Sequence, residues 1–126
     1  MASYTFDSNI LIDALLGFDV ARAEIGAAAD KGHRVWVSRM VWVEVLSKGT
    51  APQVRRATTF LAGFGMDEVD AEIAERAASL RRDRPRLKSP DAIILATAQV
   101  RGRILVTRNT KDFPAGMPGI RVPYIL

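Results

Sequence analysis

The sequence has no cysteine and only one histidine, His33. A chain without cysteine has no disulfide framework and no thiolate metal site, and it suits a reducing compartment. A single histidine argues against a zinc site and against a catalytic triad built on histidine. Because His33 lies in a Gly-His-Arg segment beside an expected strand, we expect it to be a surface residue.

Long apolar runs and nucleotide-binding loops are also missing. No uncharged apolar stretch approaches the roughly 18 residues of a membrane-spanning helix, and the N-terminus lacks the basic and apolar segments of a signal peptide. Neither a GxxxxGK nor a GxGxxG loop occurs. We therefore expect a cytoplasmic protein that does not enter a membrane and whose chemistry uses other side chains.

The composition fits one globular domain spanning residues 1–126. Hydrophobic residues make up 48% of the chain and charged residues 25%, which is enough apolar material for a core and argues against disorder. The net charge is +4 and the pI is about 10.0. This charge permits attraction to phosphate groups but does not by itself establish nucleic-acid binding.

Short apolar segments alternate with amphipathic segments along the chain. Strands are expected at residues 3–6, 34–38, 66–69 (an edge strand), 104–106 and 120–122. Helices are expected to begin at N-caps formed by Ser8, Asp19, Ser38, Thr50, Asp70 and Ser89. This alternation predicts an α/β fold with a short, mostly parallel sheet flanked by helices.

Right-handed crossovers in such a fold bring the ends of the strands to one edge of the sheet, at Asp7, Ser38 and Thr107. Ligands of open parallel sheets bind at this edge. Asp7 is conspicuous there, because a carboxylate between an apolar strand and an apolar helix is costly to leave unpaired.

Four acids lie at or just past strand ends or helix starts, namely Asp7, Glu44, Asp91 and Asp112. Each has an ordinary explanation as well, as a turn acid, a solvated helix residue, an acid favoured by a helix dipole, or a loop acid. If the acids converge, their repulsion must be offset, and Mg²⁺ or Mn²⁺ is the usual solution. Such an ion supports hydrolysis of phosphate esters.

Three polar residues could support such a site. Asn9 follows Asp7 by two positions and could orient its carboxylate, or it could simply belong to the first turn of the helix. Thr107 and Asn109 could act in the same way from the other strand end, although asparagine is also common in turns.

Four segments in this order resemble the PIN-domain family, and most closely the VapC-type toxins of bacterial toxin–antitoxin pairs. They are Phe-Asp-Ser-Asn-Ile-Leu-Ile-Asp at 6–13, Val-Trp-Val-Glu-Val-Leu at 41–46, Ser-Pro-Asp-Ala-Ile-Ile-Leu-Ala-Thr-Ala at 89–98, and Val-Thr-Arg-Asn-Thr-Lys-Asp-Phe at 106–113. The resemblance covers essentially the whole chain.

The resemblance implies a PIN-like three-layer sandwich and a ribonuclease that depends on Mg²⁺ (or Mn²⁺), usually dimeric and held inactive by a small antitoxin. Its quartet of catalytic, metal-binding acids carries over onto Asp7, Glu44, Asp91 and Asp112. One departure concerns Asn109, because many members have an acid there. We therefore expect Asp112 to be the outer ligand and Asn109 a supporting polar group. The reaction would leave a 5′-phosphate and a 3′-hydroxyl.

Basic and aromatic residues suggest contacts with substrate and partners. Lys88, Arg103 and Arg108 lie beside the acidic segments and could bind RNA phosphates, or they could be solvated surface charges. The large aromatic residues could form a dimer interface or an antitoxin groove, or they could pack in the core. They are Trp36, Trp42, Phe60 and Phe64.

Other classes of protein remain open. A receiver domain is disfavoured because it needs adjacent acids after the first strand, and a haloacid-type phosphatase usually has a longer core. A non-cleaving RNA-binding module is disfavoured by the intact acids. A PIN nuclease of RNA processing is barely separated from a toxin by the sequence alone.

Overall fold

The computed structural model describes residues 3–30, 35–114 and 116–126 of the chain. His33 and the expected start of the second strand at Arg34 lie outside these residues. The five strands of the described chain form one sheet in the order β3-β2-β1-β4-β5, and every pair is parallel. The strands are β1 (Tyr4–Phe6), β2 (Val35–Ser38), β3 (Gly65–Asp67), β4 (Ile104–Val106) and β5 (Ile120–Arg121).

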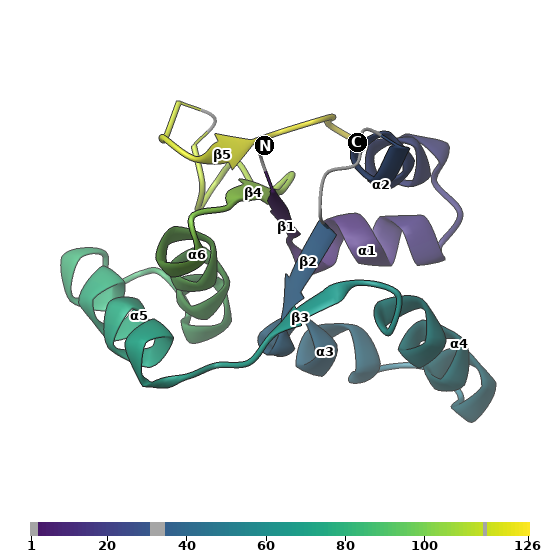
Figure 1. Ribbon diagram of the computed structural model, residues 1–126, viewed down its shortest axis with the longest axis horizontal. Helices are drawn as coiled ribbons and strands as arrows, with labels where there is room; N and C mark the ends of the chain where they lie inside the picture. Colours follow the sequence, from purple (N-terminus) through teal and green to yellow (C-terminus); the bar gives the residue numbers. More distant parts are fainter. Residues whose placement is uncertain (1–2, 31–34, 115) are drawn as a thin grey trace.

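Helices cover both faces of this sheet, so the fold is the expected three-layer α/β sandwich. Figure 1 shows α5 and α6 on one side of the sheet and α1, α2 and α4 on the other. The helices are α1 (Ser8–Leu15), α2 (Asp19–Asp30), α3 (Arg39–Leu46), α4 (Ala51–Leu61), α5 (Ala71–Asp83) and α6 (Ser89–Arg101). No described helix is long and apolar enough to cross a membrane.

The core lies between the sheet and these helices. The side chains of Phe6 and Leu105 have no exposed surface, as expected for the central strands of a parallel sheet. Ile94 of α6 is equally buried, and Gly102 ends that helix in the left-handed conformation (φ 66°). The expectation that α6 is a buried helix is therefore confirmed.

Three of the six predicted N-caps instead lie inside the first turn of their helix. Asp7, not Ser8, caps α1, because its carboxylate accepts a hydrogen bond from the Ser8 N–H at 2.8 Å. Lys88, not Ser89, is the N-cap of α6, and its side chain makes no capping hydrogen bond. Asp19 similarly lies in the first turn of α2. The first of these corrections matters most, because it fixes the Asp7 carboxylate at the start of a helix.

The other predicted caps are confirmed. Ser38 accepts a hydrogen bond from Met40 N–H, and Asp70 accepts one from Ile73 N–H. Thr50 forms a reciprocal capping box with Gln53. The predicted edge strand β3 is also present, although it begins and ends earlier than expected.

Candidate active site

Asp7 occupies the carboxyl end of the central strand β1. Its backbone N–H donates to the Val106 carbonyl at 2.9 Å, which continues the β1–β4 ladder, and only 2% of the residue is exposed. The carboxylate accepts hydrogen bonds from Thr107 Oγ1 at 2.7 Å and from Asn9 Nδ2 at 3.3 Å. Burial raises the pKa of Asp7 despite these hydrogen bonds, and the charge of Glu44 raises it further. The site therefore holds a carboxylate whose charge is incompletely compensated.

Thr107 joins the two strand ends. Its hydroxyl donates to Asp7 and accepts hydrogen bonds from the Asn109 N–H at 3.0 Å and from Asn9 Nδ2 at 3.2 Å. Thr107 has no exposed surface. Thr107, Asn9 and Asn109 thus form one hydrogen-bonded group with Asp7, which places the three expected supporting residues at the same strand ends.

Glu44 reaches the same point from α3. Ser8 Oγ donates to Glu44 Oε1 at 2.9 Å and lies 3.4 Å from Asp7 Oδ1, so one hydroxyl connects the two carboxylates. Burial raises the pKa of Glu44, and the negative charge of Asp91 adds to this effect. Sequence analysis treated Ser8 only as a helix cap and missed this bridge.

Asp91 lies in the first turn of α6, where the helix dipole alone would favour its ionised form. Its pKa is nevertheless raised to about 6, mainly by burial and then by the negative charges of Asp7 and Asp112; the charge of Lys88 acts in the opposite direction. A helix-dipole role therefore does not explain Asp91. The nearby acids are close enough to oppose its ionisation.

Asp112 and Asn109 hold each other in the loop after β4. Asn109 Nδ2 donates to Asp112 Oδ2 at 3.0 Å, and the Asp112 N–H donates to Asn109 Oδ1 at 3.2 Å. Arg84, at the end of α5, donates to the Asp112 carbonyl. The asparagine that replaces an acid of the resembling family is thus occupied in orienting Asp112, whose charge acts on Asp91.

Two of the four predicted acids, Asp7 and Asp91, line an open hollow of about 440 Å³, called the acidic hollow below. Glu44 and Asp112 lie outside its lining and border two neighbouring hollows. The acidic hollow lies at the carboxyl edge of the sheet, where the ends of β1 and β4 meet α1 and α6. Its lining residues are Asp7, Ser8, Asn9, Asp91, Arg108, Asn109, Thr110 and Lys111.

The donor set of this site suits a hard divalent cation, because it consists of carboxylate oxygens that raise one another's pKa. Within residues 3–30, 35–114 and 116–126, however, no three His, Cys, Asp or Glu side chains lie close enough to hold one ion. Mg²⁺ is commonly bound through only one or two carboxylates, with water filling the other positions. The residues present fit that mode of binding.

Arg103 and Arg108 are both engaged in ion pairs. Arg103 pairs with Asp67, and its guanidinium lies 3.8 Å from the ring centre of Trp36. Arg108 donates to Asp13 at 2.7 and 3.1 Å, and Tyr124 donates to the same carboxylate at 2.8 Å. Arg108 still lines the acidic hollow, whereas the structure places Arg103 outside its lining. Lys88 is exposed and close to Asp91.

Asp13 was not predicted to have a role. It is only 2% exposed, although it lies in an otherwise apolar part of α1. Burial alone would raise its pKa, but hydrogen bonds from Arg108 and Tyr124 lower it. A carboxylate at a core-facing position of an apolar helix was the signal in the sequence, and its partner could not be read from it.

The large aromatic residues mostly pack within the molecule. Phe60 and Phe64 meet edge to face with ring centres 5.2 Å apart, and Phe64 lies 6.3 Å from Phe6. Arg39 lies 4.6 Å from the Trp42 ring centre. Gly65 leaves room for the Trp36 ring, because a Cβ there would lie 2.6 Å from it.

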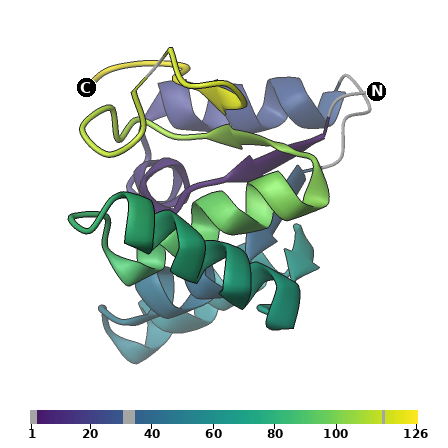
Figure 2. The ribbon, with the colours of Figure 1, turned by 90° about the vertical axis from the view of Figure 1, so that its left-hand side faces the viewer.

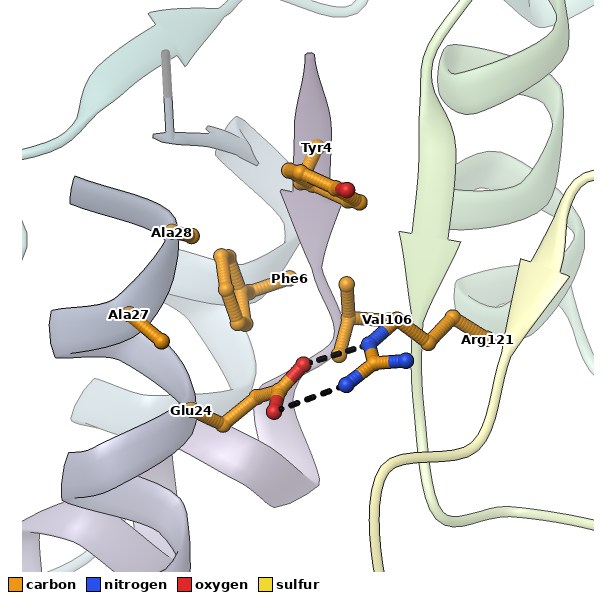
Figure 3. Close-up of a pocket in the computed structure, with 7 residues that line it drawn as sticks. All are labelled: Tyr4, Phe6, Glu24, Ala27, Ala28, Val106 and Arg121. Atoms are coloured by element: carbon orange, nitrogen blue, oxygen red, sulfur yellow. Dashed lines mark hydrogen bonds and ion pairs between the residues drawn. The ribbon is translucent and has the colours of Figure 1, made fainter. Parts of the chain in front are cut away.

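A separate cavity of about 130 Å³ lies between α2 and the strands β1, β4 and β5. Figure 3 shows that Glu24 and Arg121 face each other across it, joined by hydrogen bonds of 2.6 and 3.1 Å. Because this carboxylate is neutralised by a bidentate arginine, the cavity does not offer the uncompensated charge found in the acidic hollow.

Comparisons with known proteins agree with this geometry. A family model described as the PIN domain matches residues 4–115. A search of curated proteins found no match.

Solved structures are similar over almost the whole chain. A toxin–antitoxin complex from Klebsiella pneumoniae contains a chain with 40% identity and a TM-score of 0.86, covering 98% of this chain and 100% of that one. A DNA-bound VapBC from Salmonella typhimurium has 22% identity and a TM-score of 0.79, covering 96% of each chain. VapBC2 from Rickettsia felis, bound to a promoter fragment, has 22% identity and a TM-score of 0.78, covering 93% and 94%.

Proposed function

The chain belongs to the PIN-domain family, a family of nucleases, and we propose that it is an endoribonuclease that acts as the toxin of a toxin–antitoxin pair. It would hydrolyse RNA phosphodiesters with Mg²⁺ or Mn²⁺ as cofactor. The observation that carries this proposal is the meeting of Asp7, Glu44 and Asp91 at the carboxyl edge of the sheet, where burial and mutual repulsion raise the pKa of each acid.

The four acids have separable tasks in this proposal. Asp7 and Asp91 would hold the cation, since both line the acidic hollow. Glu44, whose carboxylate accepts a hydrogen bond from Ser8, would add a negative charge near the cation from α3. Asp112 would act as an outer ligand oriented by Asn109. When bound, the cation supplies neutralisation of phosphate charge and a water of lowered pKa.

The remaining polar residues fix this arrangement before substrate arrives. Thr107 and Asn9 restrain both the position and the ionisation of Asp7, because their hydrogen bonds favour its charged form. A phosphodiester that enters the acidic hollow would meet Arg108, which lines it, and Lys88, which lies near Asp91. The Ser8 hydroxyl connects Glu44 and Asp7 without neutralising either carboxylate.

A small antitoxin is the proposed protein partner, supported by the Klebsiella pneumoniae complex at 40% identity. The surface also offers a place for it. An apolar hollow of about 300 Å³ between α1, α3 and α4 is lined by residues that include Ile12, Leu15 and Val45, and it reaches Glu44. Leu16, at its edge, is 70% exposed. An apolar antitoxin segment seated there would contact the site directly.

A homodimer acting in the cytoplasm completes the proposal. Exposed apolar side chains are available for self-association, among them Phe18 at 44% and Val43 at 57% exposure. The cytoplasm is where an RNA-cleaving toxin would meet its substrate.

Expression in a bacterial host tests the biological role. The wild-type chain should arrest growth and produce discrete RNA fragments with 5′-phosphate ends, whereas an Asp7→Asn chain at the same level should do neither. Co-expression of the gene beside it, if that gene encodes a small DNA-binding protein, should restore growth. Cleavage without growth arrest would favour a nuclease of RNA processing, and the absence of both would contradict the proposal.

A further inference from the structure

A second hollow borders the acidic hollow. It has a volume of about 690 Å³ and is called the basic hollow here. Its lining residues are Arg84, Pro85, Arg86, Leu87, Lys88, Lys111 and Asp112. Lys111 lines both hollows, so the two adjoin through this side chain. Figure 2 shows the loop after α5 and the loop after β4 at the same end of the molecule.

The cations of the basic hollow are largely unpaired. Within the described chain, neither Arg86 nor Lys111 has an ion pair or a side-chain hydrogen bond, and both are exposed. Lys88 lies near Asp91 but is exposed as well. Arg84 is less exposed, and among the described residues its buried Nη1 has no hydrogen-bond partner. Its Nη2 binds a carbonyl and not a carboxylate, so Arg84 adds a positive charge to the lining that no ion pair of the described chain neutralises.

The loop that carries these cations is anchored. Leu87 is only 2% exposed, its N–H donates to the Arg84 carbonyl at 2.9 Å, and its own carbonyl accepts a hydrogen bond from Arg81 Nε at 2.9 Å. Arg84 Nη2 donates to the Asp112 carbonyl, which ties this loop to the loop of the acidic hollow. The backbone that carries Arg84, Arg86 and Lys88 is therefore anchored beside the loop of Asp112.

We propose that the basic hollow is a phosphate-binding subsite that holds the RNA backbone beside the scissile bond, with Arg84, Arg86, Lys88 and Lys111 as its contacts; this inference rests on the proposed ribonuclease function. The acids of the reaction centre repel a polyanion, so a neighbouring positive surface is needed to bring RNA to them. Contacts of this kind position the chain without reading its bases.

Binding and cleavage are measured separately to test the subsite. The probe is a fluorescent single-stranded RNA of mixed sequence, and the protein carries Asp7→Asn so that it binds without cutting. Arg86→Ala/Lys111→Ala is added to this background because both side chains are exposed. Arg84 is left intact, since its loss would also release Asp112. The control is Arg55→Ala/Arg76→Ala, which removes the same charge from exposed positions on α4 and α5 that line neither hollow.

We expect Arg86→Ala/Lys111→Ala to raise the Kd for RNA about fivefold for each cation removed. The slope of log Kd against log salt should fall by about 0.7 for each lost phosphate contact. The Arg55→Ala/Arg76→Ala control should change neither value beyond a general charge effect, and thermal unfolding should show that both variants are folded.

The outcomes separate the two proposals. Equal RNA affinity in the Arg86→Ala/Lys111→Ala protein and its Arg55→Ala/Arg76→Ala control overturns the subsite, as does the absence of any RNA binding by the Asp7→Asn protein. A third outcome is that Arg86→Ala/Lys111→Ala weakens RNA binding although the wild-type protein cuts no RNA. That outcome would retain the subsite and overturn the nuclease.

Discussion

Replacing Asp91 with asparagine should stabilise the metal-free protein. The pKa of Asp91 is raised from 3.8 to about 6 in the folded chain, so the folded state binds this proton more tightly than the unfolded state. Its contribution to stability is then present below pH 3.8 and is lost as the pH rises through about 6. At pH 7 the ionised group opposes folding, and asparagine removes that cost.

The magnitude follows from the shift. A displacement of about two pKa units corresponds to roughly 3 kcal/mol, and solvent screening of this half-buried group reduces the expected gain to about 1–2 kcal/mol. Urea unfolding in EDTA should therefore show Asp91→Asn to be more stable than the wild type at pH 7, with little difference near pH 4. Mg²⁺ should then stabilise the wild type more than the variant.

Asp19→Asn is the matched control, because Asp19 is an exposed acid in the first turn of α2. An acid that serves only the helix dipole contributes about 0.3–1 kcal/mol, so this variant should be slightly less stable than the wild type. If Asp91→Asn behaves like Asp19→Asn in EDTA, Asp91 is an ordinary helix-start acid and the reasoning about mutual repulsion is refuted.

Three further variants test individual contacts. Thr107→Val removes the 2.7 Å hydrogen bond that lowers the pKa of Asp7, so RNA cleavage should slow and its pH profile should move to higher pH; an unchanged profile would contradict this. Arg103→Met removes one of two cations that face Asp67, which is 6% exposed. Arg101 Nε stays 3.7 Å from the same carboxylate, so urea unfolding should show a loss of about 1–3 kcal/mol, while RNA binding by the folded protein stays unchanged. Asp13→Asn should lower stability by about 1–3 kcal/mol at pH 7 and reduce the acid sensitivity of the fold, because its pKa is lowered in the folded chain; equal acid unfolding of variant and wild type would contradict this.

Much of the site could be anticipated because its signals are local. An acid between an apolar strand and an apolar helix marks the carboxyl end of a strand, and the structure places Asp7 there. Parallel topology then brings Thr107 to the same edge, since β1 pairs with β4. The cap of α1 was misplaced by one residue because aspartate and serine are both good caps and the sequence does not say which carboxylate or hydroxyl will turn toward the helix.

Contacts between distant segments could not be anticipated in the same way. Ser8 and Glu44 are 36 positions apart, as are Asp67 and Arg103, and nothing in their local sequence marks them as partners. The placement of Arg103 depends on the ring of Trp36 in β2 and on Asp67 in β3, which only the folded sheet brings to it. A basic residue that is close to an acidic segment in the sequence is therefore not always close to those acids in the folded chain.

The most direct test of the account is cleavage of a pool of cellular RNAs by the purified, antitoxin-free protein in Mn²⁺ or Mg²⁺, beside EDTA and Asp7→Asn controls. The account predicts discrete products with 5′-phosphate and 3′-hydroxyl ends that disappear in both controls, while Asp7→Asn remains folded. Products that persist with Asp7→Asn, or a folded wild-type protein that cuts no RNA in the pool, would contradict it.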